Sequence, residues 1–244
     1  MLMGEISTFG WISIFAIGAM LVNTFGIWAI CKKSEWAEKL KEYCMCFAAG
    51  ILISSPLIMT FPQALEKTPN AGFATLAGFV FMFFSNKIIK HMTKQRELAF
   101  GITAVEGILI HSLIDGVIYT VTFSISTVIG IMTGVGLVVH EFAEGIITFS
   151  MLLKGGLSAK KAGIYAFLVA ALTTPIGAFL AYPFIQKLGN NVLGYALGFV
   201  AGVLIYVSAS HLLPEASEHE KKHSTLAFII GIAFAFGMMF THHH

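Results

Sequence analysis

Long apolar stretches constrain this chain more than any other feature of its sequence. Cutting the sequence at charged and turn residues leaves eight apolar segments, each close to the length that crosses a bilayer as a helix. Only 11% of the 244 residues are charged, whereas an ordinary soluble domain carries about 25%. The sequence therefore predicts an all-α polytopic membrane protein that spans the lipid bilayer.

We expect one transmembrane domain over residues 1–244, with residues 242–244 set aside because they have the composition of a trimmed affinity tag. The N-terminal stretch lacks a positively charged start and a small-residue cleavage site, so its first segment is expected to be a retained helix. The eight helices are predicted at approximately 6–30, 44–65, 71–90, 98–122, 124–153, 159–186, 192–216 and 224–241.

The positive charges are distributed very unevenly over the predicted loops. Thirteen of the fifteen Lys and Arg residues lie in loops on one side, and only Lys67 and Lys187 lie on the other. Because cytoplasmic loops carry the excess of Lys and Arg, both termini should be extracytoplasmic, in a plasma or inner membrane. Cys31, Cys44 and Cys46 then flank a cytosolic loop, where thiols stay reduced. The short basic loops offer no surface for nucleic acid.

The chain also contains an internal repeat. Residues 47–66, "FAAGILISSPLIMTFPQALE", align without gaps to residues 199–218, "FVAGVLIYVSASHLLPEASE". These segments belong to the second and seventh predicted helices, which run in opposite directions. The sequence thus predicts an inverted repeat that relates helices 1–3 to helices 6–8, with helices 4 and 5 between them. Such repeats are typical of secondary transporters, whose substrate site lies near the midplane.

Ionisable residues gather in the middle of the two intervening helices. Helix 4 carries "HSLIDG", with His111 and Asp115 one turn apart, and helix 5 carries "HEFAEG", with His140, Glu141 and Glu144 within little more than a quarter of its surface. Imidazole and carboxylate ligands suit a divalent transition metal, zinc above all. With neutral histidines the cluster carries three negative charges, and a bound metal ion would offset the cost of burying them.

A purely structural role is the alternative for these residues. A single buried His or Glu often bridges helices as a satisfied polar group. Five ionisable residues at matching depths on two adjacent helices instead favour a functional site, because such residues are expensive inside a membrane.

The two motifs, of the forms H-[NS]-x-x-[DE]-G and H-E-x-x-E-G on consecutive helices, resemble those of the ZIP (ZRT/IRT-like) divalent metal transporters. The resemblance extends over the whole chain through the eight spans, the two outer termini and the "HLLPEA" stretch of helix 7. It implies a two-metal transport site on helices 4 and 5 and movement of metal towards the cytosol. By this resemblance, the metal ligands are His111, Asp115, His140, Glu141 and Glu144.

Some positions depart from the family's pattern. Ser112 stands where many members have Asn, and Thr174 stands before Pro175 where some members have Glu, so the second metal position is less well supported. Ser112 and Thr174 are therefore weaker candidate ligands. His211 and Glu215 share a face near the end of helix 7, and the resemblance implies that this region receives departing ions; a solvated helix end is the alternative.

We therefore predict uptake of divalent transition metal ions, most simply zinc, by alternating access, with the metal as transported substrate and no cofactor. Iron, manganese, cobalt and cadmium remain open as substrates. An intramembrane zinc-dependent hydrolase is the alternative, because "HEFAE" begins like the H-E-x-x-H of metalloproteases, although Glu144 replaces the second His. A passive channel is a third reading, and we expect no enzyme.

Three glycines form a ladder of small residues on predicted helix 7, at Gly194, Gly198 and Gly202. Such ladders allow helices to approach closely. The ladder could serve packing within the chain or a homodimer interface, and the sequence leaves both open.

Overall fold

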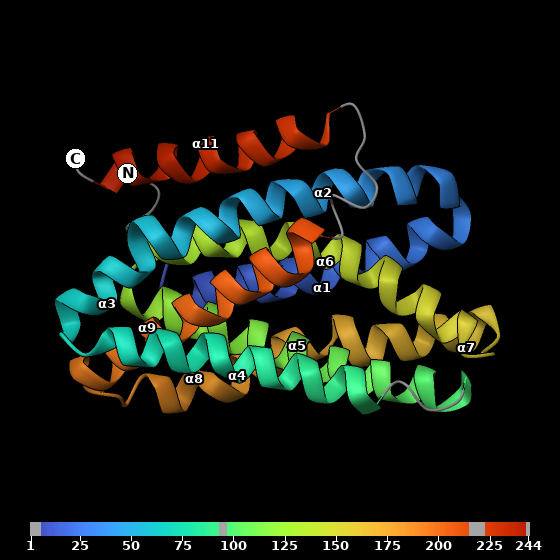
Figure 1. Cartoon of the computed structure of the whole chain (residues 1–244), viewed down its shortest axis with the longest axis horizontal. Helices are drawn as coiled ribbons and strands as arrows, with labels where there is room; N and C mark the ends of the chain where they lie inside the picture. Colours follow the sequence, from blue (N-terminus) through green and yellow to red (C-terminus); the bar gives the residue numbers. More distant parts are fainter. Residues whose placement is uncertain (1–5, 93–96, 215–222, 243–244) are drawn as a thin grey trace.

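The computed structural model of the protein describes residues 6–92, 97–214 and 223–242. Within these ranges the chain is helical, with short turns and no β-strand. Figure 1 shows the helices gathered in one bundle, with successive long helices reversing direction. In order, the described elements, with π-helical segments written η, are α1 (Thr8–Lys32), α2 (Ser34–Ser55), η2 (Pro56–Thr60), α3 (Phe61–Lys67), α4 (Ala71–Met92), α5 (Glu97–Ile125), α6 (Thr127–Lys154), α7 (Ala159–Ala166), η3 (Phe167–Ala171), α8 (Thr173–Ile185), α9 (Asn190–Val207), η4 (Ser208–Leu212) and α11 (Ser224–His242).

The described helices have the length and composition of membrane spans. Six are long and apolar enough to cross a membrane, and two shorter apolar helices, Ala71–Ser85 and Ser224–Met239, accompany them. Some consecutive elements form one continuous helix. Elements α2, η2 and α3 together make a single span, and elements α7, η3 and α8 make another. The prediction of an all-α polytopic membrane protein of about eight helices is confirmed.

The second span extends beyond its predicted apolar segment. Helix α2 begins at Ser34, whereas hydropathy places the start of the segment at residue 44. The charged first turns remain helical because their inner face is buried: Ala37 is fully buried and belongs to a cluster with Phe142 and Ile146 of α6. Hydropathy detects the apolar part of this helix but not its amphipathic extension.

Two of the π-helical segments occupy equivalent positions in the internal repeat. Segments η2 and η4 coincide when residues 47–66 are aligned with residues 199–218. Pro56 opens η2 and has no backbone N–H to complete an α-helical hydrogen bond. The hydroxyl groups of Thr60 and Ser208 donate to backbone carbonyls at 3.2 and 2.7 Å. Both repeats therefore distort their helix at the same place, and π turns occur frequently at functional sites.

The helix packing repeats in the same way. Helix α2 packs against α11, and its counterpart α9 packs against α4. The contact is made by matching glycines: a Cβ on Gly50 would overlap the backbone of Phe228, and a Cβ on Gly202 would overlap the backbone of Thr75. Because Gly50 and Gly202 align in the repeat, the inverted relation is present in the contacts as well as in the sequence.

The glycine ladder on α9 serves packing within the chain. A Cβ on Gly194 would meet Thr68, and Cβ atoms on Gly198 and Gly202 would meet Ala71 and Thr75. The ladder therefore faces α4 and the turn that precedes it. It gives no support to a homodimer interface, and a homodimer stays a prediction.

The four remaining spans form the part of the bundle that carries the two motifs. Helix α1 packs on α6 and on α8, and α5 packs on α6 and on α8. Here too the contacts match: Gly26 of α1 approaches the carbonyl of Phe142, and Gly177 of α8 approaches the carbonyl of Leu113. Phe142 and Leu113 hold the same position in "HEFAEG" and "HSLIDG". Helices α5 and α6 are thus held side by side, each against an equivalent partner.

Candidate metal centre

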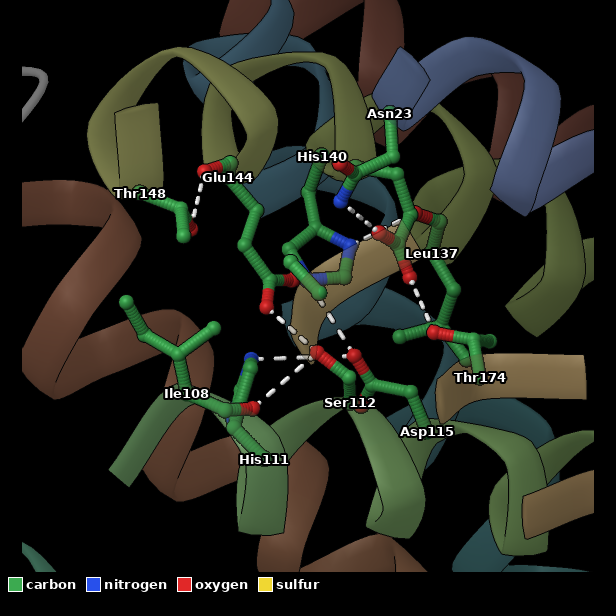
Figure 2. A network of polar contacts seen from close by, with 12 residues as sticks. Asn23, Ile108, His111, Ser112, Asp115, Leu137, His140, Glu144, Thr148 and Thr174 are labelled. Atoms are coloured by element: carbon green, nitrogen blue, oxygen red, sulfur yellow. Dashed lines mark hydrogen bonds and ion pairs between the residues drawn. The ribbon is translucent and has the colours of Figure 1, made fainter. Parts of the chain in front are cut away.

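Four of the predicted ligands meet between α5 and α6. The i, i+4 spacing of each motif sets a histidine and a carboxylate one turn apart on one face. His111 Nε2 lies 3.6 Å from Asp115 Oδ2, and His140 Nε2 lies 3.3 Å from the same oxygen and 3.5 Å from Glu144 Oε2. One ligand atom from each residue lies within 4.8 Å of the other three. Figure 2 shows these side chains converging from the two helices.

Three of the converging atoms of this group are buried and have no hydrogen-bond partner among the described residues. Asp115 Oδ2, His140 Nε2 and Glu144 Oε2 accept or donate no hydrogen bond among the described residues. Buried polar atoms are almost always hydrogen-bonded, so each exception requires an explanation. Three such atoms pointing at one another, two of them carboxylate oxygens, form the donor set that a divalent cation would satisfy.

The orientation of His140 prepares its ring as a ligand. Its Nδ1 contacts the backbone carbonyl of Leu137 at 2.5 Å. Because a carbonyl only accepts hydrogen bonds, this contact assigns the proton to Nδ1, and in the neutral ring the lone pair of Nε2 then points into the group. A second hydrogen bond of this kind is the usual support of a metal-bound histidine.

Ser112 supports a carboxylate of the group. Its hydroxyl lies 2.6 Å from Glu144 Oε1 and 3.0 Å from the carbonyl of Ile108. The bond to Glu144 holds one oxygen of that carboxylate and leaves Oε2 facing the other ligands. Ser112 is thus placed beside the group, in contact with a predicted ligand.

Glu141 lies apart from the four-residue group. Its side chain is fully buried, and its carboxylate accepts hydrogen bonds from Asn23 Nδ2 at 2.7 Å and from Thr174 Oγ1 at 3.0 Å. Asn23 belongs to α1 and Thr174 to α8. Figure 2 labels the two donors, Asn23 and Thr174, and draws their hydrogen bonds as dashed lines. That Glu141 coordinates a metal stays a prediction.

Thr173 and Thr174 differ in what they contact. Thr173 Oγ1 donates within its own helix, to the carbonyls of Val169 and Ala170, where η3 widens the helix. Thr174 instead reaches Glu141 on a neighbouring helix. The first residue satisfies backbone groups, and the second takes part in the site.

Comparison with known proteins identifies the family. A profile of the ZIP zinc transporters matches residues 93–240, which is more than half of the chain and includes both motifs. The chain belongs to the ZIP zinc transporter family. ZIP proteins are metal transporters rather than enzymes, and the hydrolase alternative has no support.

Individual ZIP relatives are distant in sequence. The chain is 24% identical to the zinc transporter ZupT of Chlorobium limicola, over 83% of this chain and 85% of that protein. It is 23% identical to the zinc transporter YKE4 of Saccharomyces cerevisiae, over 75% of this chain and 63% of that protein. The match to ZupT of Clostridium perfringens, at 28% identity, covers 41% of this chain and 46% of that protein.

His211 and Glu215 are the remaining residues to which the ZIP resemblance assigns a role, and they fall near the end of predicted helix 7 in the sequence. His211 falls in η4, but its side chain is outside the described part of the structure, as is all of Glu215. Their role in receiving departing ions stays a prediction.

The sequence reading missed Asn23. It is a polar residue in the otherwise apolar first span, and it is fully buried. An intramembrane polar residue is by itself a signal of function or of helix bridging. Its partner could not be found from spacing, because Asn23 and Glu141 lie far apart in the sequence.

Proposed function

We propose that this chain moves divalent transition metal ions, zinc first, through a membrane towards the cytosol by alternating access. The observation that carries the proposal is the buried group of His111, Asp115, His140 and Glu144 on the paired motif helices. We propose these four residues as the ligands that bind the ion directly. With neutral histidines they carry two negative charges, which one divalent ion balances.

The orientation that we propose for the chain rests on its charges. Helix α1 begins and α11 ends at one end of the bundle, at the left of Figure 1, whereas the Lys-rich connections from α1 to α2 and from α6 to α7 lie at the other end. In the sequence, thirteen of the fifteen Lys and Arg residues belong to the loops predicted on that side. The positive-inside rule assigns the Lys-rich end to the cytosol and both termini to the outside. Large apolar side chains such as Phe73 and Phe184, which are 77% and 71% exposed, would face lipid in a cell membrane.

An aromatic cluster supports alternating access, because it covers the ligands at the proposed outer end. Tyr119 and Phe123 follow Asp115 on α5 at one-turn intervals and are buried. Phe15 of α1 contacts both rings, at centroid distances of 6.2 and 5.1 Å, and Trp11 stacks on Phe123. Among the ligands, the side chain of His111 is the most exposed, at 25%. The ligand group is thus covered on the side of α5 that leads outwards.

The decisive test is zinc influx into liposomes that hold purified protein in the membrane and a zinc-sensitive dye inside. Saturable influx is expected for the wild type, with at least a hundredfold loss in His140→Ala, because removal of a ligand leaves buried charges uncompensated. His223→Ala removes an exposed histidine that is distant from both motifs in the sequence, and it serves as the matched control. Equal influx in wild type and His140→Ala would contradict the proposed site, and non-saturable influx would favour a channel.

A further inference from the structure

We propose that Asn23, Glu141 and Thr174 form a positioning bridge that fastens α6 to α1 and α8, and that the ligand group beside it holds a single divalent ion. The inference rests on the proposed function and gives Glu141 a different role from that of a metal ligand. We call these three residues the carboxylate bridge.

The contacts of the carboxylate bridge are complete on both sides of Glu141. One oxygen accepts from the Asn23 amide at 2.7 Å, and the other accepts from the Thr174 hydroxyl at 3.0 Å. All three side chains are fully buried. A buried carboxylate needs such donors, and hydrogen bonds to a charged group are worth more than those between neutral groups. The bridge therefore stabilises one arrangement of three helices.

The inverted repeat places the two donors at equivalent positions. Gly145 of α6 approaches the backbone carbonyl of Asn23, and Gly116 of α5 approaches the backbone carbonyl of Thr174. Gly145 and Gly116 are the last residues of the two motifs. Asn23 and Thr174 therefore occupy equivalent places in the two halves of the molecule, which are α1 to α5 and α6 to α11. Each residue lies against the motif helix on which its own helix packs.

The carboxylate that joins the donors has no counterpart in the other half. The residue of "HSLIDG" that matches Glu141 is Ser112, whose hydroxyl bonds to Glu144. A single acidic residue of α6 thus receives a donor from each half. Both second positions of the motifs make hydrogen bonds between helices, and the ligand group is left to the first and fifth positions.

The charges favour one ion. Asp115 and Glu144 supply two negative charges to the ligand group, equal to the charge of one divalent cation. With Glu141 counted as well, one divalent ion leaves a net charge of −1, and the hydrogen bonds from Asn23 and Thr174 stabilise that charge on Glu141. A second divalent ion would leave a net charge of +1 for which this group provides no further acceptor. The amide of Asn23 and the hydroxyl of Thr174 also direct their hydrogens at Glu141, and these positive ends repel a cation that approaches its oxygens.

Equilibrium dialysis of the detergent-purified full chain against zinc tests the stoichiometry. One zinc per chain is expected for the wild type and for Glu141→Gln, with dissociation constants within about threefold of each other. Two ions in the wild type that fall to one in Glu141→Gln would overturn the inference. So would a loss of affinity clearly greater than threefold in Glu141→Gln, because removal of a residue that ligates the ion or supports a ligand costs about tenfold or more.

Zinc influx into liposomes tests the positioning role. Asn23→Ala and Thr174→Val should lower the maximal rate about tenfold with KM unchanged, because each leaves one oxygen of a buried carboxylate without its donor. Thr174→Ser keeps the hydroxyl and should restore the rate. Thr148→Val is the matched control, because Thr148 is equally buried but donates only to the backbone carbonyl of Glu144.

Unchanged maximal rates in Asn23→Ala and Thr174→Val would overturn the bridge, as would failure of Thr174→Ser to restore the rate. Gel filtration checks that each variant elutes as the wild type does, and if Asn23→Ala does not, the Thr174 pair decides the question. A wild type that binds one zinc but shows no influx contradicts the proposed function. The dialysis result for Glu141→Gln still decides the stoichiometry in that case.

Discussion

His140 shows how the surroundings of a single residue inside the bundle suit the ligand role that we propose for it. Its Nδ1 is held by the carbonyl of Leu137, and its Nε2 faces Asp115 and Glu144 without a hydrogen-bond partner among the described residues. A histidine without such a contact would lose conformational freedom on binding metal, because its tautomer and rotamer would become fixed only then. His140 has both set by a backbone atom of its own helix, which lowers the ordering cost of coordination.

At the same scale, Ser112 supplies a testable contribution to zinc affinity. Ser112→Ala removes the 2.6 Å bond to Glu144 Oε1, and this carboxylate can then rotate away from the other ligands. Loss of a hydrogen bond to a charged group costs about 1.5–3 kcal/mol, so the zinc affinity should fall by at least about tenfold. Equilibrium dialysis measures the change. Ser13→Ala is the control, because Ser13 Oγ donates only to the carbonyl of Phe9; equal losses in both variants would contradict this role.

At the scale of elements, close contacts between helices depend on glycine at defined positions. Gly202→Ala places a Cβ against the backbone of Thr75 in α4 and should destabilise the protein by about 1–3 kcal/mol through overpacking. Thermal unfolding in detergent, followed by circular dichroism, should show a lower midpoint. Gly72→Ala is the matched control, because a Cβ there meets nothing within 4 Å. A midpoint for Gly202→Ala at or above that of Gly72→Ala would contradict the packing described here.

The sequence predicts most of the elements and the central part of the site. Apolar length is a strong signal, and the i, i+4 spacing of His111 with Asp115 and of His140 with Glu144 was enough to bring these residues to one face. The remainder depends on contacts distant in sequence. Glu141 lies on the motif helix but bonds to Asn23 and Thr174 on two others, and helical spacing says nothing about which neighbours a residue meets.

Sequence patterns also did not predict the π-helical segments. Pro56 signals a disturbance in η2, since it lacks a donor. Its counterpart η4 begins at Ser208 and contains no proline. The matching distortion of the two helices therefore reflects a packing environment that the two halves share, which periodicity and propensity do not register.

At the scale of the whole molecule, the proposed orientation can be tested through the native cysteines. Cys31 is exposed at the end of α1, whereas Cys46 is buried. Asn70 is exposed in the turn between α3 and α4, at the proposed outer end. In a variant that lacks all three native cysteines, a membrane-impermeant maleimide should label Asn70→Cys in intact cells. A second variant keeps Cys31 and has Cys44 and Cys46 replaced by Ala. Cys31 alone should react only after the cells are permeabilised. Labelling of Cys31 in intact cells would reverse the orientation.

The two halves of the molecule carry different residues at equivalent positions, and this difference has a consequence for the energetics of transport. Exchanging the conformations of the halves would give a second arrangement that uses the same kinds of helix contact but opens to the other side. If the halves were identical, both arrangements would be equally populated. Glu141 matches Ser112, and Asn23 matches Thr174, so the arrangements differ in free energy, and each 1.4 kcal/mol shifts their populations about tenfold. Under the proposed alternating access, this bias would contribute to the rate of the cycle, whereas the metal gradient would set its direction.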